Sequence, residues 1–155
     1  MKKIIVSFSL LLAIGISSMS ATPVYTGVST PFNTPDPRVE KLLQKEFIGA
    51  EHIKWSKEEG YITATFVWGG QRTQAWFSQE GELVGSIRGI SYNQLPLVVI
   101  RSIQARFNQP VMIELREVTN LDGTRYKLIL EDGAKKYKVS ILPDGIFEET
   151  KRLKK

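Results

Sequence analysis

The residue types that most often perform catalysis or bind metal ions are scarce in this chain. His52 is the only histidine, and there is no cysteine. One histidine beside Glu51 falls far short of the ligands of a zinc site or the partners of a catalytic triad, so we expect His52 to be structural or exposed to solvent. Without thiols the chain has no cysteine nucleophile, no thiolate metal site and no disulfide. The sequence therefore predicts no metal and no cofactor.

Carboxylates are the remaining candidates for acid–base chemistry, and local structure accounts for the aspartates. Asp36 precedes Pro37 at a predicted helix start, where a carboxylate can cap free N–H groups. The other three aspartates each precede a glycine in a predicted turn: Asp122, Asp132 and Asp144. The glutamate pairs lie near turns or the C-terminal end, and nothing selects from them the spaced pair that a glycosidase uses. We therefore expect no catalytic residues and no enzyme activity.

A β-hairpin is predicted where two alternating apolar and polar runs flank Gly69 and Gly70. Both glycines can take positive φ, as a two-residue primed turn requires. Counting outward from the turn gives one face that suits a core, formed by Ile62, Ala64, Phe66, Trp68, Gln71, Thr73, Ala75 and Phe77. The opposite face is mixed and carries Tyr61, Arg72 and Trp76.

A second hairpin is predicted over residues 125–142, with its turn at Asp132 and Gly133. Its core face is formed by Tyr126, Leu128, Leu130, Tyr137, Val139 and Ile141. Its other face is basic and is formed by Arg125, Lys127, Ile129, Lys136 and Lys138.

An amphipathic helix is predicted before each hairpin, one beginning at Asp36 and one near Pro96. Their apolar stripes match each other: Val39, Leu43 and Phe47 in the first, Val99, Ile103 and Phe107 in the second. Because the hairpins match as well, the sequence predicts one unit used twice, over residues 36–91 and 92–155, the second ending in a basic tail. The predicted fold is α+β, with two tandem repeats that each pack one helix on a roughly four-stranded antiparallel sheet.

The N-terminus has the features of an export signal. Two lysines are followed by an apolar run over residues 4–16 and then by small residues. We place cleavage after Ala21, with cleavage after Ser20 as the alternative. The run is 13 residues long, fewer than the roughly 20 that span a bilayer. Residues 1–21 are therefore predicted to be a signal peptide rather than an anchor.

The segment 22–35 is rich in threonine and proline without periodicity, which predicts a flexible leader. Loss of the signal removes two lysines and no acid, so the net charge falls from +5 to +3. This mild excess is not gathered into one helix or stripe and does not indicate a nucleic-acid partner. The sequence predicts a periplasmic or secreted protein with no membrane span in its mature form.

A set of short spaced motifs extends over most of the mature chain. They are Ile53-x-Trp55, Tyr61 to Phe66, Ala75-x-Phe77, Gly81, Leu95-Pro96, Ile103, Phe107, Glu117-Val118, Tyr126-x-Leu128, Tyr137-x-Val139-x-Ile141 and Asp144-Gly145. Together they resemble the PepSY-like family of small exported bacterial proteins, over about residues 36–150. That family is related in fold to the β-lactamase inhibitory proteins.

The resemblance implies tandem repeats whose sheets join into one larger concave sheet that offers a face to a partner. It also implies an inhibitor-like or binding role. It supplies no catalytic residues, and the residues by which the true inhibitors grip their enzyme have no match here, so that target is not carried over.

The sheet face that the helices leave uncovered is the candidate binding surface. Its seven predicted contact residues are Tyr61, Arg72, Trp76, Arg125, Lys127, Lys136 and Lys138. A large aromatic side chain left in water forgoes roughly 1.5–3 kcal/mol of burial, and Trp, Tyr and Arg dominate interface hot spots. Aromatic and basic residues side by side suit an acidic or extended protein partner. The competing interpretation is an ordinary solvated face on which Trp76 folds against its neighbours.

The leading hypothesis is an exported, non-catalytic protein that binds an envelope or secreted protein through this open face. Inhibition or modulation of that protein, a peptidase among the candidates, is the expected consequence of binding. Two other hypotheses stay open. The chain could carry a small molecule or lipid in a cavity between helices and sheet, or it could be a hydrolase.

Overall fold

The computed structural model of the chain describes residues 30–31, 35–58 and 60–154. The predicted signal peptide and most of the predicted leader lie outside these residues. The described chain forms nine strands: β1 (Thr30–Pro31), β2 (Glu51–Glu58), β3 (Tyr61–Trp68), β4 (Gln71–Phe77), β5 (Leu83–Gly89), β6 (Val111–Asn120), β7 (Gly123–Asp132), β8 (Lys135–Ile141) and β9 (Phe147–Leu153). Its helices are α1 (Pro37–Glu46), α2 (Leu97–Arg106) and the 3₁₀ turn η1 (Tyr92–Gln94).

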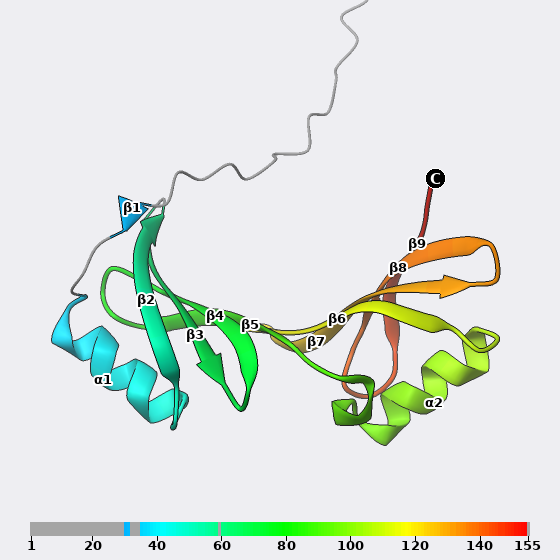
Figure 1. The fold of residues 1–155 in the computed structure, drawn as a ribbon, viewed down its shortest axis with the longest axis horizontal. Coiled ribbons are helices and arrows are strands. Elements are labelled where there is room, and N and C mark those ends of the chain that lie inside the picture. The colour runs from blue at the N-terminus through cyan, green and yellow to red at the C-terminus, as the bar shows by residue number, and fades with distance from the viewer. Residues whose placement is uncertain (1–29, 32–34, 59, 155) are drawn as a thin grey trace, which may run out of the picture.

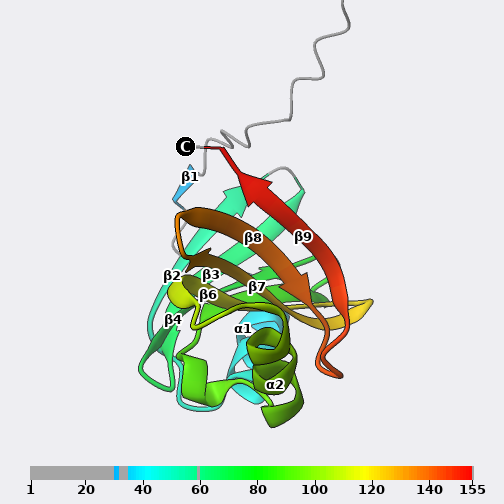
Figure 2. The ribbon, with the colours of Figure 1, turned by 90° about the vertical axis from the view of Figure 1, so that its right-hand side faces the viewer.

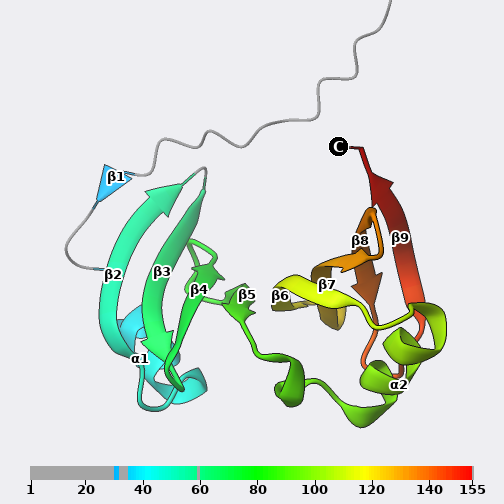
Figure 3. The same ribbon diagram turned by 45° about the vertical axis from the view of Figure 1, so that its right-hand side comes forward.

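The nine strands form one antiparallel sheet in which each strand pairs with the next along the chain. Both α-helices lie on the same side of this sheet, α1 near one end and α2 near the other (Figure 1). The end strands β2 and β3 rise on one side and β8 and β9 on the other, so the face away from the helices is concave (Figures 1 and 3). Within the described part of the chain, no helix is long and apolar enough to cross a membrane.

The prediction of two tandem repeats, each with a helix on its own four-stranded sheet, is wrong. β5 pairs with β6 from Gly85–Asn120 to Gly89–Arg116, so the sheet runs through the expected boundary without a break. The α-helices in the described residues are short, with 10 residues each, and the fold is mostly sheet. The segment that carries α2 connects two neighbouring antiparallel strands of that sheet, β5 and β6.

The first hairpin agrees with its prediction in both turn and register. Gly69 and Gly70 have φ values of 57° and 75°, which are the positive values of a primed turn. The pairs run from Trp68–Gln71 to Ile62–Phe77, so the predicted core face is confirmed. The helix before it begins as predicted, because the carboxylate of Asp36 accepts a hydrogen bond of 2.8 Å from the backbone N–H of Arg38.

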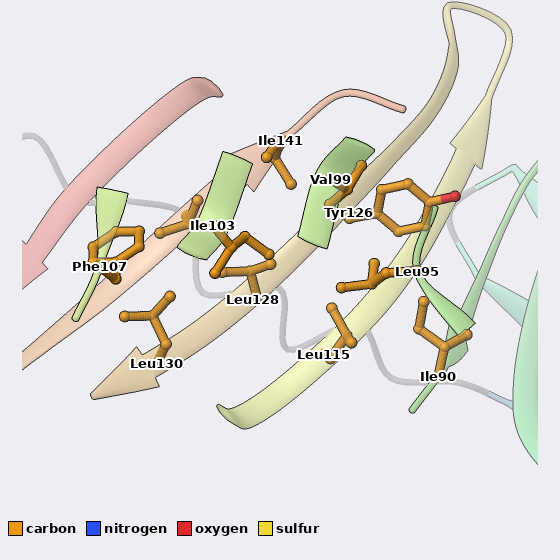
Figure 4. Close-up of a cluster of buried hydrophobic side chains, with 11 residues drawn as sticks. Ile90, Leu95, Val99, Ile103, Phe107, Leu115, Tyr126, Leu128, Leu130 and Ile141 are labelled. Carbon is orange, nitrogen blue, oxygen red and sulfur yellow. The ribbon is translucent and has the colours of Figure 1, made fainter. Parts of the chain in front are cut away.

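Each helix buries its apolar stripe against one end of the sheet. At the α1 end, Phe47 packs edge-on against Phe66, with ring centroids 4.9 Å apart. At the α2 end, Val99 and Ile103 are fully buried over Leu128 on β7 (Figure 4). Both stripes were predicted, and together they fix which sheet face is inward.

Two details of the C-terminal half differ from the prediction. The second hairpin turns at Gly133 and the residue after it, because Asp132 pairs with Lys135. This displaces each pairing by two residues and therefore leaves the faces as predicted. The expected basic tail is instead the strand β9, which pairs with β8 at the edge of the sheet (Figure 2).

Candidate functional site

The open face is the side of the sheet that points away from α1 and α2. All seven predicted contact residues lie on it, because each alternates along its strand with residues of the buried core. Trp76, for example, pairs with Thr63 while its neighbours Ala75 and Phe77 are buried beneath α1. Lys127 likewise lies between the buried Tyr126 and Leu128.

The structure divides these residues into two groups. Tyr61, Arg72 and Trp76 lie on β3 and β4, and we call them the aromatic group. The basic group lies on β7 and β8 and consists of Arg125, Lys127, Lys136 and Lys138. The strands β5 and β6 separate the two groups, so β4 and β7 are three strand spacings apart, about 14 Å. The seven residues therefore form two contact areas rather than one compact site.

In the aromatic group, Tyr61 is 44% exposed and Arg72 is exposed as well. Trp76 is half-buried, and its cross-strand partner Thr63 is 0% exposed although it lies on the open face. The expectation that Trp76 stands in water is therefore only partly met, because the sheet already covers part of its indole. Tyr61 is the better-placed anchor.

Between the two groups, β5 presents Gly85, Ile87 and Gly89 to the open face, and these positions were missed by the sequence analysis. The glycines carry no side chain, so along this central strand Ile87 alone projects toward a partner. It pairs with Gln74 on β4 and Val118 on β6, and all three are half-buried. The alternation Gly-x-Ile-x-Gly in the sequence could have revealed this feature. It indicates a strip with few side chains along the middle of the sheet, which we call the low strip.

Gly85 is required by close packing of the backbone. A Cβ at this position would lie 2.8 Å from the carbonyl oxygen of Thr119 on β6, closer than van der Waals contact allows. β5 and β6 therefore approach each other closely beside Gly85, where the two ends of the sheet meet.

The basic group is partly neutralised by neighbouring carboxylates. Arg125 Nε lies 3.9 Å from Glu148 Oε2, and Lys136 Nζ lies 3.5 Å from Glu131 Oε1. Lys127 and Lys138 are exposed and take part in none of the ion pairs found in the described residues. Within the basic group, these two lysines are therefore the positive charges that a partner can reach without breaking an ion pair.

Lys151 was not among the predicted contact residues, because it was expected to lie in the basic tail. Lys151 lies on β9 directly opposite Lys138, and it is exposed. It extends the positive charge of the open face to the edge of the sheet. The alternating polar sequence of β9 gave no apolar period by which a strand could be recognised.

The groups with shifted pKa values lie outside the open face. The hydrogen bonds from Arg38 lower the pKa of Asp36 to about 2. Burial raises the pKa of Tyr126, and the nearby carboxylate of Glu117 raises it further. His52 is exposed and has a φ of 54° in an irregular part of β2. Among the described residues, no group of three or more metal-ligating side chains is found.

The aromatic group and the basic group together determine what the open face offers a partner: aromatic contact, hydrogen bonding and positive charge.

Solved structures share this architecture. A BLIP-like protein from Bacteroides fragilis NCTC 9343 matches with a TM-score of 0.66 and 21% identity, covering 79% of this chain and 89% of that chain. A DUF2874 family protein from Bacteroides ovatus ATCC 8483 matches with a TM-score of 0.64 and 21% identity, covering 78% and 89%. A protein from Bacteroides eggerthii DSM 20697, for which a periplasmic location has been proposed, matches with a TM-score of 0.63 and 23% identity, covering 78% and 90%.

No protein-family model and no curated protein matches the sequence. Identities of this size show a shared fold, so membership of the PepSY-like family stays a prediction. The chain has a BLIP-like fold.

Proposed function

We propose that this protein is exported and binds an envelope or secreted protein through the open face of its sheet, without catalysing a reaction. Binding inhibits or modulates that partner, for which an exported peptidase is one candidate. The observation that carries the proposal is the composition of the open face: a concave sheet surface, away from both α-helices, with Tyr61 exposed at one end and unpaired lysines at the other.

The physical support comes from what such a surface can do. Tyrosine and arginine supply large contact areas and directional hydrogen bonds, and both are enriched at hot spots. The low strip along β5 leaves room for a protruding loop between the two groups of contact residues. Exposed lysines add electrostatic attraction, which speeds encounter and selects partners of opposite charge.

The likeness to the other structures supports the same class of function. One of them is described as BLIP-like, and a periplasmic location has been proposed for another. The predicted signal peptide fits such a location. Membership of the PepSY-like family of small exported proteins is part of this proposal.

Site-specific photo-crosslinking in cells tests the proposal. A photoreactive amino acid replaces Tyr61, which lies on the open face, and in a second strain it replaces Leu97, which is 61% exposed on α2. We expect a defined crosslinked protein from the Tyr61 position only, identified by mass spectrometry. If the two positions give the same products, or neither gives one, the open face is not the binding surface.

Purified variants provide the matched measurement on the partner that is found. Arg72→Ala together with Tyr61→Ala should weaken its binding, because both lie in the aromatic group. Lys41→Ala together with Gln44→Ala changes two exposed residues of α1 and should leave binding unchanged. If the partner is an enzyme, its activity with and without each variant shows whether binding inhibits it. Equal affinity of both double variants would overturn the assignment of this face.

A further inference from the structure

Lys138 on β8 and Lys151 on β9 are direct cross-strand partners on the open face. Like charges in this position repel each other and destabilise a sheet. Lys127 on β7 is the diagonal neighbour of Lys138, because Lys138 pairs with Ile129, two residues further along β7. Three strands thus bring together three exposed lysines, and we call these the lysine cluster.

A hollow adjoins the lysine cluster and supplies further polar groups. It has a volume of about 260 Å³, and its lining includes Arg125, Lys127, Lys138, Ser140, Glu148 and Glu149. The hydroxyl of Ser140 donates to Glu148 Oε2 at 2.9 Å. Arg125 Nε is buried without a hydrogen-bond acceptor among the described residues, and its distance of 3.9 Å from Glu148 is too long for a hydrogen bond.

The carboxylates in the wall restrict what kind of anion fits. Glu148 and Glu149 stand beside the lysine cluster, and a surface with a uniform negative charge, such as a lipid bilayer or a nucleic acid, would meet them as well. The concave shape also prevents a flat bilayer from reaching the sheet (Figure 1). An extended protein segment suits the site better, because its side chains alternate and can place single carboxylates on the lysines.

We propose that the lysine cluster binds a segment of the partner protein in which acidic residues alternate with neutral ones. This inference rests on the proposed function and specifies the partner's chemistry at one end of the open face. Partner carboxylates pair with Lys127, Lys138 and Lys151, and they relieve the repulsion between the two facing lysines. The carboxylates of the partner thus supply ion pairs that the three lysines do not form with Glu131, Glu148 or Glu149 in the described residues.

The test uses two synthetic peptides of about eight residues, one alternating Glu with Thr and the other alternating Gln with Thr. Binding to the purified mature protein is measured by fluorescence anisotropy. The cluster variant carries Lys127→Gln, Lys138→Gln and Lys151→Gln. Its control carries Lys41→Gln, Lys45→Gln and Arg101→Gln, which remove the same charge from exposed helix positions.

We expect the Glu peptide to bind the native protein and the control, and to bind the cluster variant about tenfold more weakly. The difference should shrink as salt rises above about 0.1 M, since the Debye length is then below about 10 Å. The Gln peptide should bind all three proteins weakly and alike.

Three results would overturn the inference: equal binding of the Glu peptide to all three proteins, no binding to the native protein, or preferential binding of phosphatidylglycerol vesicles or inorganic phosphate by the lysine cluster. Photo-crosslinking at Tyr61 distinguishes failure of this inference from failure of the proposed function. If the partner crosslinks equally to the native protein and the cluster variant, the open face still binds but the acidic segment is wrong.

Discussion

Arg88 on β5 and Glu117 on β6 join the two ends of the sheet through paired hydrogen bonds on its helix-covered face. Arg88 Nε donates to Glu117 Oε1 at 2.8 Å, and its terminal nitrogen donates to Oε2 at 3.2 Å. The side chains are 29% and 19% exposed, and the ring of Trp68 lies 4.9 Å from the guanidinium carbon. The pair thus connects β5 to β6 in the middle of the sheet, beside Trp68 of β3.

Glu117→Gln should lower the free energy of unfolding by about 1–3 kcal/mol, because it leaves a mostly buried guanidinium without its counter-charge. Urea unfolding of the purified protein measures the change. The control is Glu114→Gln, which removes the partner of Arg116 on the same strand from an exposed pair, and should cost less than about 1 kcal/mol. Equal losses in the two variants would mean that burial adds nothing to the Arg88–Glu117 interaction.

The hairpin faces could be predicted from sequence because their determinants are local. The two glycines at 69 and 70 fix the turn, and the period of two then fixes the face of every residue from Tyr61 to Phe77. Even where the second turn was placed one residue early, the face assignment survived, since the displacement was even. The open-face position of all seven predicted contact residues followed from this counting alone.

The continuity of the sheet was implied only by the resemblance and could not be predicted from local patterns. β5 and β6 are separated along the chain by η1 and α2, and no turn connects them that would set their register. The ion pair between Arg88 and Glu117 and the close approach at Gly85 are visible only once that pairing is known. β9 was missed because only Phe147, Thr150 and Leu153 of this edge strand are half-buried, so its sequence shows no apolar alternation. Because β9 was not predicted, the pairing of Lys138 with Lys151 could not be predicted either.

Gly85→Ala should destabilise the protein by about 1–3 kcal/mol, because the new methyl group meets a backbone carbonyl that cannot move aside cheaply. Gly89→Ala is a matched control on the same strand, where a Cβ would meet only the side-chain oxygen of Gln71 at 3.8 Å. Thermal or urea unfolding distinguishes the two. A loss at Gly89 as large as that at Gly85 would indicate a general intolerance of β5 rather than close approach to β6.

Gly69→Asn should raise the free energy of unfolding by about 0.4–1 kcal/mol, because asparagine tolerates positive φ and restricts the unfolded chain more than glycine does. Space is not a constraint, since a Cβ there would meet no atom within 4 Å. Gly69→Val should have the opposite sign, because a β-branched residue is strained at this φ. Urea unfolding of both variants gives the comparison, and stabilisation by valine would contradict the primed turn.

Tyr126 should make the native protein lose stability in alkali. Its pKa in the folded protein is raised above the ordinary value of 10.0, first by burial and then by Glu117, with Arg88 opposing. The unfolded chain therefore releases this proton at lower pH than the folded chain. The stabilising contribution is complete below pH 10 and is lost as pH rises through the folded pKa.

Tyr126→Phe removes this titration. The stability of the native protein relative to the Phe variant should therefore fall as pH rises above about 10 and through the raised folded pKa, as urea unfolding at each pH measures. Comparison of the two proteins cancels the lysines, which titrate in the same range in both. A stability difference that stays constant with pH would show that Tyr126 titrates normally.

The facing lysines should oppose stability and support binding at the same time. Lys151→Glu replaces a repulsive cross-strand pair with an attractive one, so the free energy of unfolding should rise by about 0.2–1 kcal/mol. Lys57→Glu on β2 is the control for net charge, because its partner Ile62 is uncharged. In the same variant the Glu-containing peptide should bind more weakly, since a carboxylate now occupies its place beside Lys138. A gain in stability with undiminished peptide binding would separate the two effects and remove Lys151 from the lysine cluster. A gain accompanied by weaker binding would mean that the native chain keeps an unfavourable lysine pair at the position where an acidic partner relieves it.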